Sequence, residues 1–389
     1  MSNFIQLHLL TNYGPANLNR DDLNRPKTAI VGGVQRLRVS SQCLKRAWRT
    51  SEVFESATGK RTKEMGGKIL SALMTDMTLE DVLAGKDIST AVKSEIPEKD
   101  AKDWAWKIAS VFVDKMKKDG KTVNESEVQE TEEKAKSKKE KKSNVDKKTL
   151  RSEQMVFYYP EEIGNISQLI EKLKKDKKAP SEKDVNDLLV HKGTGVDVSM
   201  FGRMMACSPD YNVEAAVQVA HAFTVHKAAV EDDYFSAVDD LNKHEEHAGS
   251  AYIGEAEFGA GLYYLYVCID RALLKENLGN NEELAQKAIR ALVESASTVS
   301  PTGKQNSFAS RAYASYVLAE KGDKQPRSLA GAFLKPVTGD DVLGRAIEAI
   351  RSTREAFNKV YADATEPYEL NVSQSIGTLS DLQNYCANE

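Results

Sequence analysis

Apolar and polar residues alternate at several places along the chain, and this alternation predicts β-strands. In residues 4–10, Ile5, Leu7 and Leu9 alternate with Gln6 and His8, which predicts a first strand with one mixed face. The same pattern predicts strands over 35–39, 196–205, 216–226, 262–269 and 312–319. The polar, glycine-punctuated stretch 231–261 predicts a hairpin.

Helical spacing separates these strands. Three- and four-residue spacing predicts helices over 78–84, 100–118 and 167–177, and further helices that start at Asn280 or Asn281 and at Asp340 or Asp341. Strands alternating with a few helices indicate an α+β fold, with an antiparallel sheet that carries its helices on one side.

One predicted helix, from Ser40 or Ser41 to about residue 54, has two distinct faces. Leu44, Ala47, Trp48 and Ser51 form a narrow apolar stripe. The opposite side carries the donors Gln42, Lys45, Arg46 and Arg49. The stripe can anchor the helix while the donors face outward.

The same region is strongly basic. From Leu23 to Ser51 the chain has seven Lys or Arg and no Asp or Glu, although the whole protein has a formal net charge of −4. Such a local field attracts a polyanion, and free amides at the helix N-terminus add an anion site. The alternative is a solvated amphipathic helix, but a solvated face usually mixes both signs.

Length and composition limit the other possibilities. A chain of 389 residues predicts two or three units, and residues 60–193 indicate a mostly helical insertion, within which 119–148 is a mobile charged loop. We expect a cytoplasmic protein, because there is no signal-peptide pattern or long apolar run and the four cysteines show no paired spacing. The histidines do not have metal-ligand spacing.

Several motifs resemble those of the CRISPR-associated CasC family, the repeated backbone subunit of the type I-E Cascade complex and a member of the RAMP superfamily. They are Leu18-Asn19-Arg20-Asp21-Asp22, Lys27, Gly32-Gly33, Arg38-Val39-Ser40-Ser41-Gln42, Leu44-Lys45-Arg46-Ala47, Gly202-Arg203-Met204, Ala220-His221-Ala222, Phe235, Ala237-Val238-Asp239-Asp240-Leu241, Glu276-Asn277-Leu278-Gly279 and Lys304-Gln305. The resemblance implies an RRM-like (ferredoxin-like) palm over 1–59 and 194–389, helical fingers over 60–193 and a thumb hairpin over 231–261.

The resemblance also implies roles for the matching residues. Ser40, Gln42, Lys45, Arg46 and Arg49 would hold guide phosphates, with Arg20, Lys27 and Arg38 nearby. Met204 would wedge against bases, Phe235 and Ser236 would lie near a displaced nucleotide, and Lys304-Gln305 would form a second RNA-side loop. The implied partners are CRISPR RNA, further copies of the chain, other Cascade subunits and target DNA paired to the guide, with no membrane and no cofactor or metal.

Two alternatives stay open at this point. Related backbone subunits cut RNA with an aspartate after the first strand, so Asp21 or Asp22 would serve a metal-dependent endoribonuclease of the RAMP type. The alternative structural role of both acids is to cap turns or to pair with Arg20 and Arg25, and we expect a protein that binds without being an enzyme. The other alternative is a general RNA-binding protein outside CRISPR defence.

Overall fold

The computed structural model describes residues 3–54, 58–113, 150–191, 193, 195–205, 208–237, 252–363 and 366–388, and the predicted charged loop 119–148 lies outside them. The chain divides into two compact units. Unit 1 contains Met1–Ser56 and Ala216–Glu389, and unit 2 contains Ala57–Ala215. The return to unit 1 therefore falls at Ala216, later in the chain than the predicted position 194.

Unit 1 is built on an antiparallel sheet with the strand order β11-β10-β1-β9-β7-β3-β2. β6 and β8 also pair with β9. The strands are β1 (Phe4–Ala16), β2 (Thr28–Val31), β3 (Val34–Val39), β6 (Val217–Val219), β7 (Ala222–Thr224), β8 (Glu231–Ala237), β9 (Tyr252–Asp270), β10 (Ala314–Gly322) and β11 (Tyr368–Asn371). β8 pairs with the first part of β9, so the 231–261 stretch forms a hairpin whose residues 238–251 are outside the description.

Most helices of unit 1 start where the sequence provides a side-chain cap; α10 (Gln305–Phe308) is the exception. Asn281 accepts a hydrogen bond from the Leu284 amide at 3.0 Å, and Asp341 accepts one from the Gly344 amide at 2.9 Å, which confirms both predicted start sites. These helices are α1 (Ser41–Arg49), α8 (Arg271–Asn277), α9 (Glu282–Thr298), α10 (Gln305–Phe308), α11 (Val342–Tyr361) and α12 (Leu379–Ala387). Short 3₁₀ helices span Glu52–Phe54, Ala330–Phe333 and Val372–Gln374.

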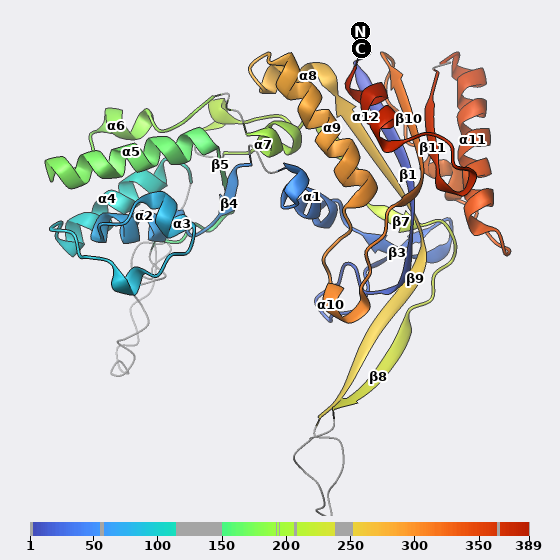
Figure 1. Ribbon diagram of the computed structural model, residues 1–389, viewed down its shortest axis with the longest axis horizontal. Helices are drawn as coiled ribbons and strands as arrows, with labels where there is room; N and C mark the ends of the chain where they lie inside the picture. Colours follow the sequence, from blue (N-terminus) through green and yellow to red (C-terminus); the bar gives the residue numbers. More distant parts are fainter. Residues whose placement is uncertain are drawn as a thin grey trace, which may run out of the picture. The chain divides into compact units, whose positions relative to one another are not determined.

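Helices cover both faces of this sheet. α11 buries Ala346, Ile347 and Ile350 in the same core as Leu10 and Tyr264, whereas α9 packs with α1. Figure 1 shows α9 and α11 on opposite sides of the strands. The prediction of helices on one side is therefore wrong, because the mixed face of β1 is buried as well.

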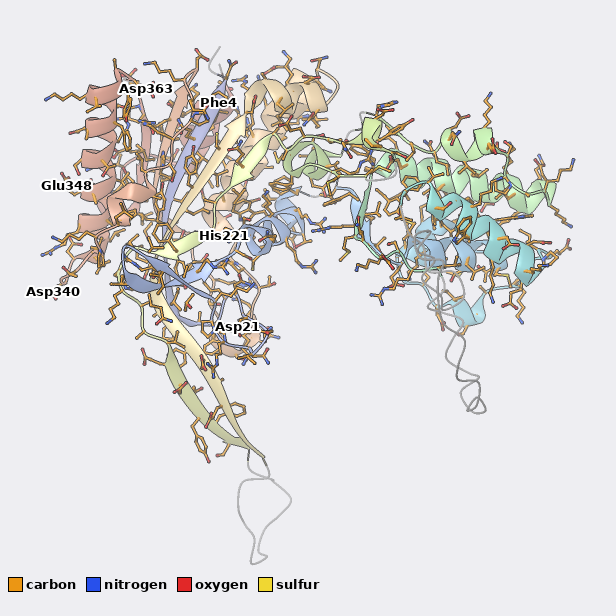
Figure 2. All side chains as sticks on the ribbon, turned by 180° about the vertical axis from the view of Figure 1, so that it is seen from behind. Phe4, Asp21, His221, Asp340, Glu348 and Asp363 are labelled. Atoms are coloured by element: carbon orange, nitrogen blue, oxygen red, sulfur yellow. The ribbon has the colours of Figure 1, made fainter. Side chains whose placement is uncertain are left out.

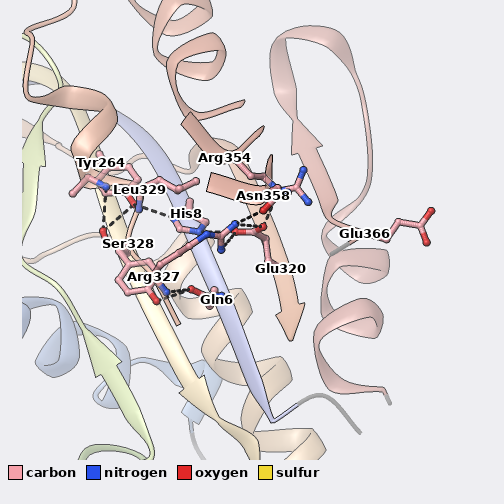
Figure 3. A network of polar contacts seen from close by, with 12 residues as sticks. Gln6, His8, Tyr264, Glu320, Arg327, Ser328, Leu329, Arg354, Asn358 and Glu366 are labelled. Carbon is pink, nitrogen blue, oxygen red and sulfur yellow. Dashed lines mark hydrogen bonds and ion pairs between the residues drawn. The ribbon is translucent and has the colours of Figure 1, made fainter. Parts of the chain in front are cut away.

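Polar residues on this face are buried because they form a closed network (Figure 3). His8 and Glu320 are completely buried, and their side chains lie 3.2 Å apart. Glu320 also accepts hydrogen bonds from Arg327 at 3.2 Å and from Arg354 of α11 at 2.7 Å. The polar half of the β1 pattern is thus a buried ionic cluster that ties α11 to the sheet.

The protonation of His8 follows from its partners. Burial lowers the pKa of His8, so the ring is neutral near pH 7. The Nε2–H group then donates to Glu320, and Nδ1 accepts from the Tyr264 hydroxyl at 2.9 Å. The Tyr264 oxygen in turn accepts from the Leu329 amide at 3.0 Å. A single tautomer therefore satisfies the whole chain of hydrogen bonds.

Unit 2 is mainly helical, as the spacing predicts. Its core contains buried residues such as Ile69, Leu73, Ile108, Ile166 and Ile170. The helices are α2 (Met65–Met74), α3 (Leu79–Leu83), α4 (Glu98–Ser110), α5 (Pro160–Asp176), α6 (Glu182–Asn186) and α7 (Val196–Phe201), with 3₁₀ helices at Ile88–Thr90 and Pro209–Tyr211. β4 (Lys60–Thr62) and β5 (Val156–Tyr158) form a two-stranded antiparallel sheet. Among the described residues, no helix is long and apolar enough to cross a membrane.

α7 replaces part of a predicted strand. The alternation over Val196–Met200 is misleading because apolar and polar residues there are all buried. Asp197 is accommodated inside because its Oδ1 accepts from the Gly59 amide at 2.8 Å. This packing also keeps residues 195–215 in unit 2, which explains the later return of the chain to unit 1.

Candidate nucleic-acid interface

Helix α1 presents the predicted cations on a firmly anchored element. Ser40 is its N-cap and accepts from the Cys43 amide at 3.3 Å, while the Ser40 amide donates to Asn19 Oδ1 at 2.9 Å. The N–H groups of Ser41 and Gln42 occupy the first turn and have no acceptor within the helix. The first turn contains no acidic residue, so this end of the helix can attract an anion.

The apolar face of α1 agrees with the spacing, but the helix ends at Arg49, earlier than the predicted residue 54, so Ser51 lies beyond it. Leu44, Ala47 and Trp48 are buried. Gln42 and Arg46 are exposed, and Lys45 and Arg49 are half-buried on the flank between the faces. Burial lowers the pKa of Lys45, so a bound anion would offset the desolvation of its ammonium group.

Lys27 and Arg38 extend this surface across the neighbouring strands. The Arg38 amide donates to the Lys27 carbonyl at 2.7 Å, which joins β3 to the residue before β2. Burial raises the pKa of the Cys43 thiol, and the charges of Lys27 and Arg46 oppose this shift. Both cations therefore act on one position in the first turn of α1.

Two cations of the basic stretch are used for internal contacts. The fully buried Arg36 donates to the carbonyls of Thr224 and Phe333 at 3.1 and 3.0 Å. Arg25 forms an ion pair with Glu257 of β9, with 3.0 Å between Nε and Oε1. The basic count along the sequence therefore overstates the number of cations available to a ligand.

The loop before β2 holds Arg20 and the two acids, of which Asp21 is labelled in Figure 2. The Arg20 side chain is exposed, and its backbone forms an isolated antiparallel β-bridge with Pro26. Asp21 Oδ1 accepts from the amides of Leu23 and Arg25, each at 2.9 Å, so this carboxylate caps the turn. Asp22 is exposed. Within the described part of the chain, no group of three or more His, Cys, Asp or Glu is arranged to hold a metal ion.

The Lys304-Gln305 loop reaches the same surface. A Cβ atom on Gly303 would lie 2.3 Å from the Leu18 carbonyl oxygen, so only glycine permits this close approach. The Cys43 thiol of α1 contacts the same oxygen at 3.9 Å. Lys304 and Gln305, both half-buried, therefore follow a residue that packs directly beside the first turn of α1.

The structure does not bring every predicted residue into this cluster. Phe235 and Ser236 are on the β8–β9 hairpin, where they pair with Gly254 and Ile253 and so point to opposite faces. Met204 belongs to unit 2 and is 81% exposed.

Arg203, just before Met204, is built into the core of unit 2. It donates to both carboxylate oxygens of Glu162, at 2.9 and 2.8 Å, and stacks on Tyr159. The predicted strand 196–205 is not formed, because α7 occupies its first part. The Arg203 backbone forms an isolated antiparallel β-bridge with Val213. This pairing fixes the backbone that presents Met204 to solvent.

Residues missed by the sequence analysis complete the cationic surface. Asn19 positions Ser40 by accepting a hydrogen bond from its amide. His221 is exposed, and its Nδ1 atom lies 2.9 Å from Nη1 of Arg38. Asn19 belongs to no charge run or periodic pattern, and His221 lies within the predicted strand 216–226, in phase with its apolar positions. Both occur in motifs that carried the resemblance, but no role was assigned to them.

The fold and this surface define a mixed α+β protein with a cationic candidate site for a polyanion, built around the N-terminus of α1. Residues 5–384 match the model of the Cas_CT1975 family, described as CT1975-like protein. The chain belongs to this family. The predicted membership of a CRISPR-associated family is thus confirmed, while the narrower CasC, type I-E assignment stays a prediction.

Solved structures give a consistent result. One similar chain comes from a "CRISPR RNA-guided surveillance complex, pre-nicking"; it is 26% identical with a TM-score of 0.74, and the match covers 99% of both chains. A chain of a second "CRISPR RNA-guided surveillance complex" is 21% identical with a TM-score of 0.66 over 99% of this chain and 100% of that one, a likeness of fold. No curated protein matches the chain.

Proposed function

We propose that this protein is a guide-RNA-binding backbone subunit of a Cascade-type CRISPR surveillance complex. The observation that carries the proposal is the cationic surface around α1, where Ser40, Gln42, Lys45, Arg46 and Arg49 surround a helix N-terminus that lacks acids in its first turn. Family membership and the likeness to a chain of an RNA-guided complex support the same reading.

The chemistry of the surface suits a ligand of varying sequence. Lysine and arginine side chains and helix amides bind phosphate oxygens, and such contacts carry no base information. The bases of a held strand stay available for pairing, and pairing with target DNA then supplies the specificity. One protein surface of this kind serves any guide.

The topology supports the palm, fingers and thumb assignment. Strands β1, β7, β9 and β10 lie side by side in the sheet in the order β10-β1-β9-β7. Along the chain, α1 lies between β1 and β7, and α9 lies between β9 and β10. This is the βαββαβ order of an RRM-like (ferredoxin-like) palm, which unit 1 would form, with unit 2 as the fingers and the β8–β9 hairpin as the thumb.

Residues outside the α1 surface have roles in an assembly. The exposed Met204 and Phe235 would contact bases, and Arg20, Lys27, Arg38, Lys304 and Gln305 would hold the strand on either side of α1. Further copies of the chain, other Cascade subunits and target DNA are the partners of this assembly. The chain acts by binding and not as an enzyme, and the use of Asp21 as a turn cap supports this view.

Titration of single-stranded RNA with the purified protein tests this function. We expect affinities that do not depend on base sequence, and a number of bound copies that increases stepwise with RNA length in native mass spectrometry. Log affinity should fall with log salt with a slope of roughly −0.7 for each phosphate contact. A preference for one base sequence, or a single bound copy at every RNA length, would contradict the proposal.

A further inference from the structure

His221 lies in the two-residue link between β6 and β7, which pair in succession with β9, at the edge of the cationic surface (Figure 2). In the β3–β7 ladder, Arg38 pairs with Phe223 and Val39 with Ala222. One further step in this antiparallel register places His221 level with Ser40, the N-cap of α1. This link is held by the Ala220 amide, which donates to the Tyr266 carbonyl of β9 at 2.9 Å.

Arg38 determines which ring nitrogen of His221 carries the proton. The Arg38 Nη1 atom lies 2.9 Å from Nδ1 of His221. A guanidinium group only donates hydrogen bonds, so Nδ1 must accept and the proton of the neutral ring is on Nε2. The Nε2–H group is on the other side of the ring from Arg38 and is therefore not used in this contact.

The charges around His221 favour a neutral ring and an anionic ligand. Burial lowers the pKa of His221, and the charges of Arg38 and Lys27 lower it further. These two cations come from β3 and from the residue before β2. The exposed donor thus belongs to a locally positive surface next to the first turn of α1.

We propose that His221 is a further nucleic-acid-binding residue, whose Nε2–H group donates a hydrogen bond to the backbone of the strand held at the α1 N-terminus. This inference rests on the proposed function. The acceptor is a phosphate oxygen or a ribose 2′-hydroxyl, both of which accept from a neutral N–H group. His221 adds a donor without a charge, and Arg38 sets the orientation of that donor.

The uncharged character of the donor can be tested by salt dependence. His221→Ala should weaken binding of single-stranded RNA about tenfold if the acceptor is a charged phosphate, and by a few-fold if it is a neutral 2′-hydroxyl. The slope of log affinity against log salt should stay unchanged. Lys27→Ala should instead reduce that slope by about 0.7, since it removes a cation. His221→Gln, which can place an N–H donor at a similar reach, should recover most of the affinity.

A DNA strand of the same base sequence identifies the acceptor. If His221→Ala weakens DNA binding equally, the acceptor is a phosphate; if it affects RNA alone, the acceptor is the 2′-hydroxyl. Unchanged RNA affinity in His221→Ala would overturn the inference. An affinity loss that comes with a lower melting temperature and is not recovered by His221→Gln would overturn it as well, because the role would then be structural. Failure of the parent protein to bind RNA would refute the proposed function itself.

Discussion

Replacing Lys45, Arg46 and Arg49 together with alanine should remove RNA from the purified protein. Charge-assisted hydrogen bonds contribute about 1.5 kcal/mol or more each, so we expect at least a 100-fold loss of affinity. Three fewer phosphate contacts should also reduce the salt slope by about 2. Fluorescence anisotropy with labelled single-stranded RNA over a salt series measures both quantities.

The fold should tolerate this triple change. Leu44 and Trp48, which anchor α1, are untouched, and alanine is the strongest helix former. Circular dichroism should therefore match that of the parent. A matched control replaces three exposed lysines that lie outside the α1 surface, Lys287, Lys324 and Lys359. Equal losses in the two triple variants would mean that net charge, and not this surface, governs RNA binding.

Glu320→Ala should destabilise unit 1 by about 3–5 kcal/mol. The substitution leaves the half-buried guanidinium groups of Arg327 and Arg354 and the buried Nε2–H group of His8 without their shared acceptor. Urea denaturation followed by tryptophan fluorescence and circular dichroism gives the loss, and Glu320→Gln provides a milder variant if the alanine protein does not fold. Glu348→Gln, at an exposed position of α11, is the control and should change stability by less than about 0.5 kcal/mol.

The same cluster should make unit 1 sensitive to acid. Burial alone would raise the pKa of Glu320, but hydrogen bonds from His8 and Arg354 and the charge of Arg327 hold it well below its ordinary value of 4.5. Burial likewise holds the pKa of His8 below 6.5. In both cases the unfolded chain binds more protons at low pH, so stability should fall as the pH drops below about 6.5 and fall further below 4.5. A denaturation midpoint that stays constant from pH 7 to pH 4 would contradict this account of the cluster.

The features that depend on local sequence could be predicted. The faces of α1, its Ser40 cap and the caps at Asn281 and Asp341 are set by residues within a few positions of one another. The helical character of unit 2 follows in the same way from three- and four-residue spacing. For these elements the sequence pattern and the structure agree because the stabilising contacts are short-range.

The features that depend on distant partners could not be predicted. Arg36 and Arg38 share a strand face and a charge, yet Arg36 is buried because carbonyls of Thr224 and Phe333 are present to accept its hydrogen bonds. Arg25 is neutralised by Glu257, which comes from the second sequence segment of unit 1. His8 lies on the mixed face of the predicted first strand, and its complete burial follows only from Glu320 and α11. Each of these assignments requires a partner more than 180 positions away, and a periodic pattern contains no information about such partners.

The nucleic acid that copurifies with the protein from its native cells tests the central claim most directly. The account predicts short RNAs of uniform length, each with a variable segment next to a shared repeat-derived end, because the chain holds phosphates and leaves the bases unread. RNA of mixed length without a shared end, or a single abundant cellular RNA, would contradict a guide-binding role and would indicate a general RNA-binding protein.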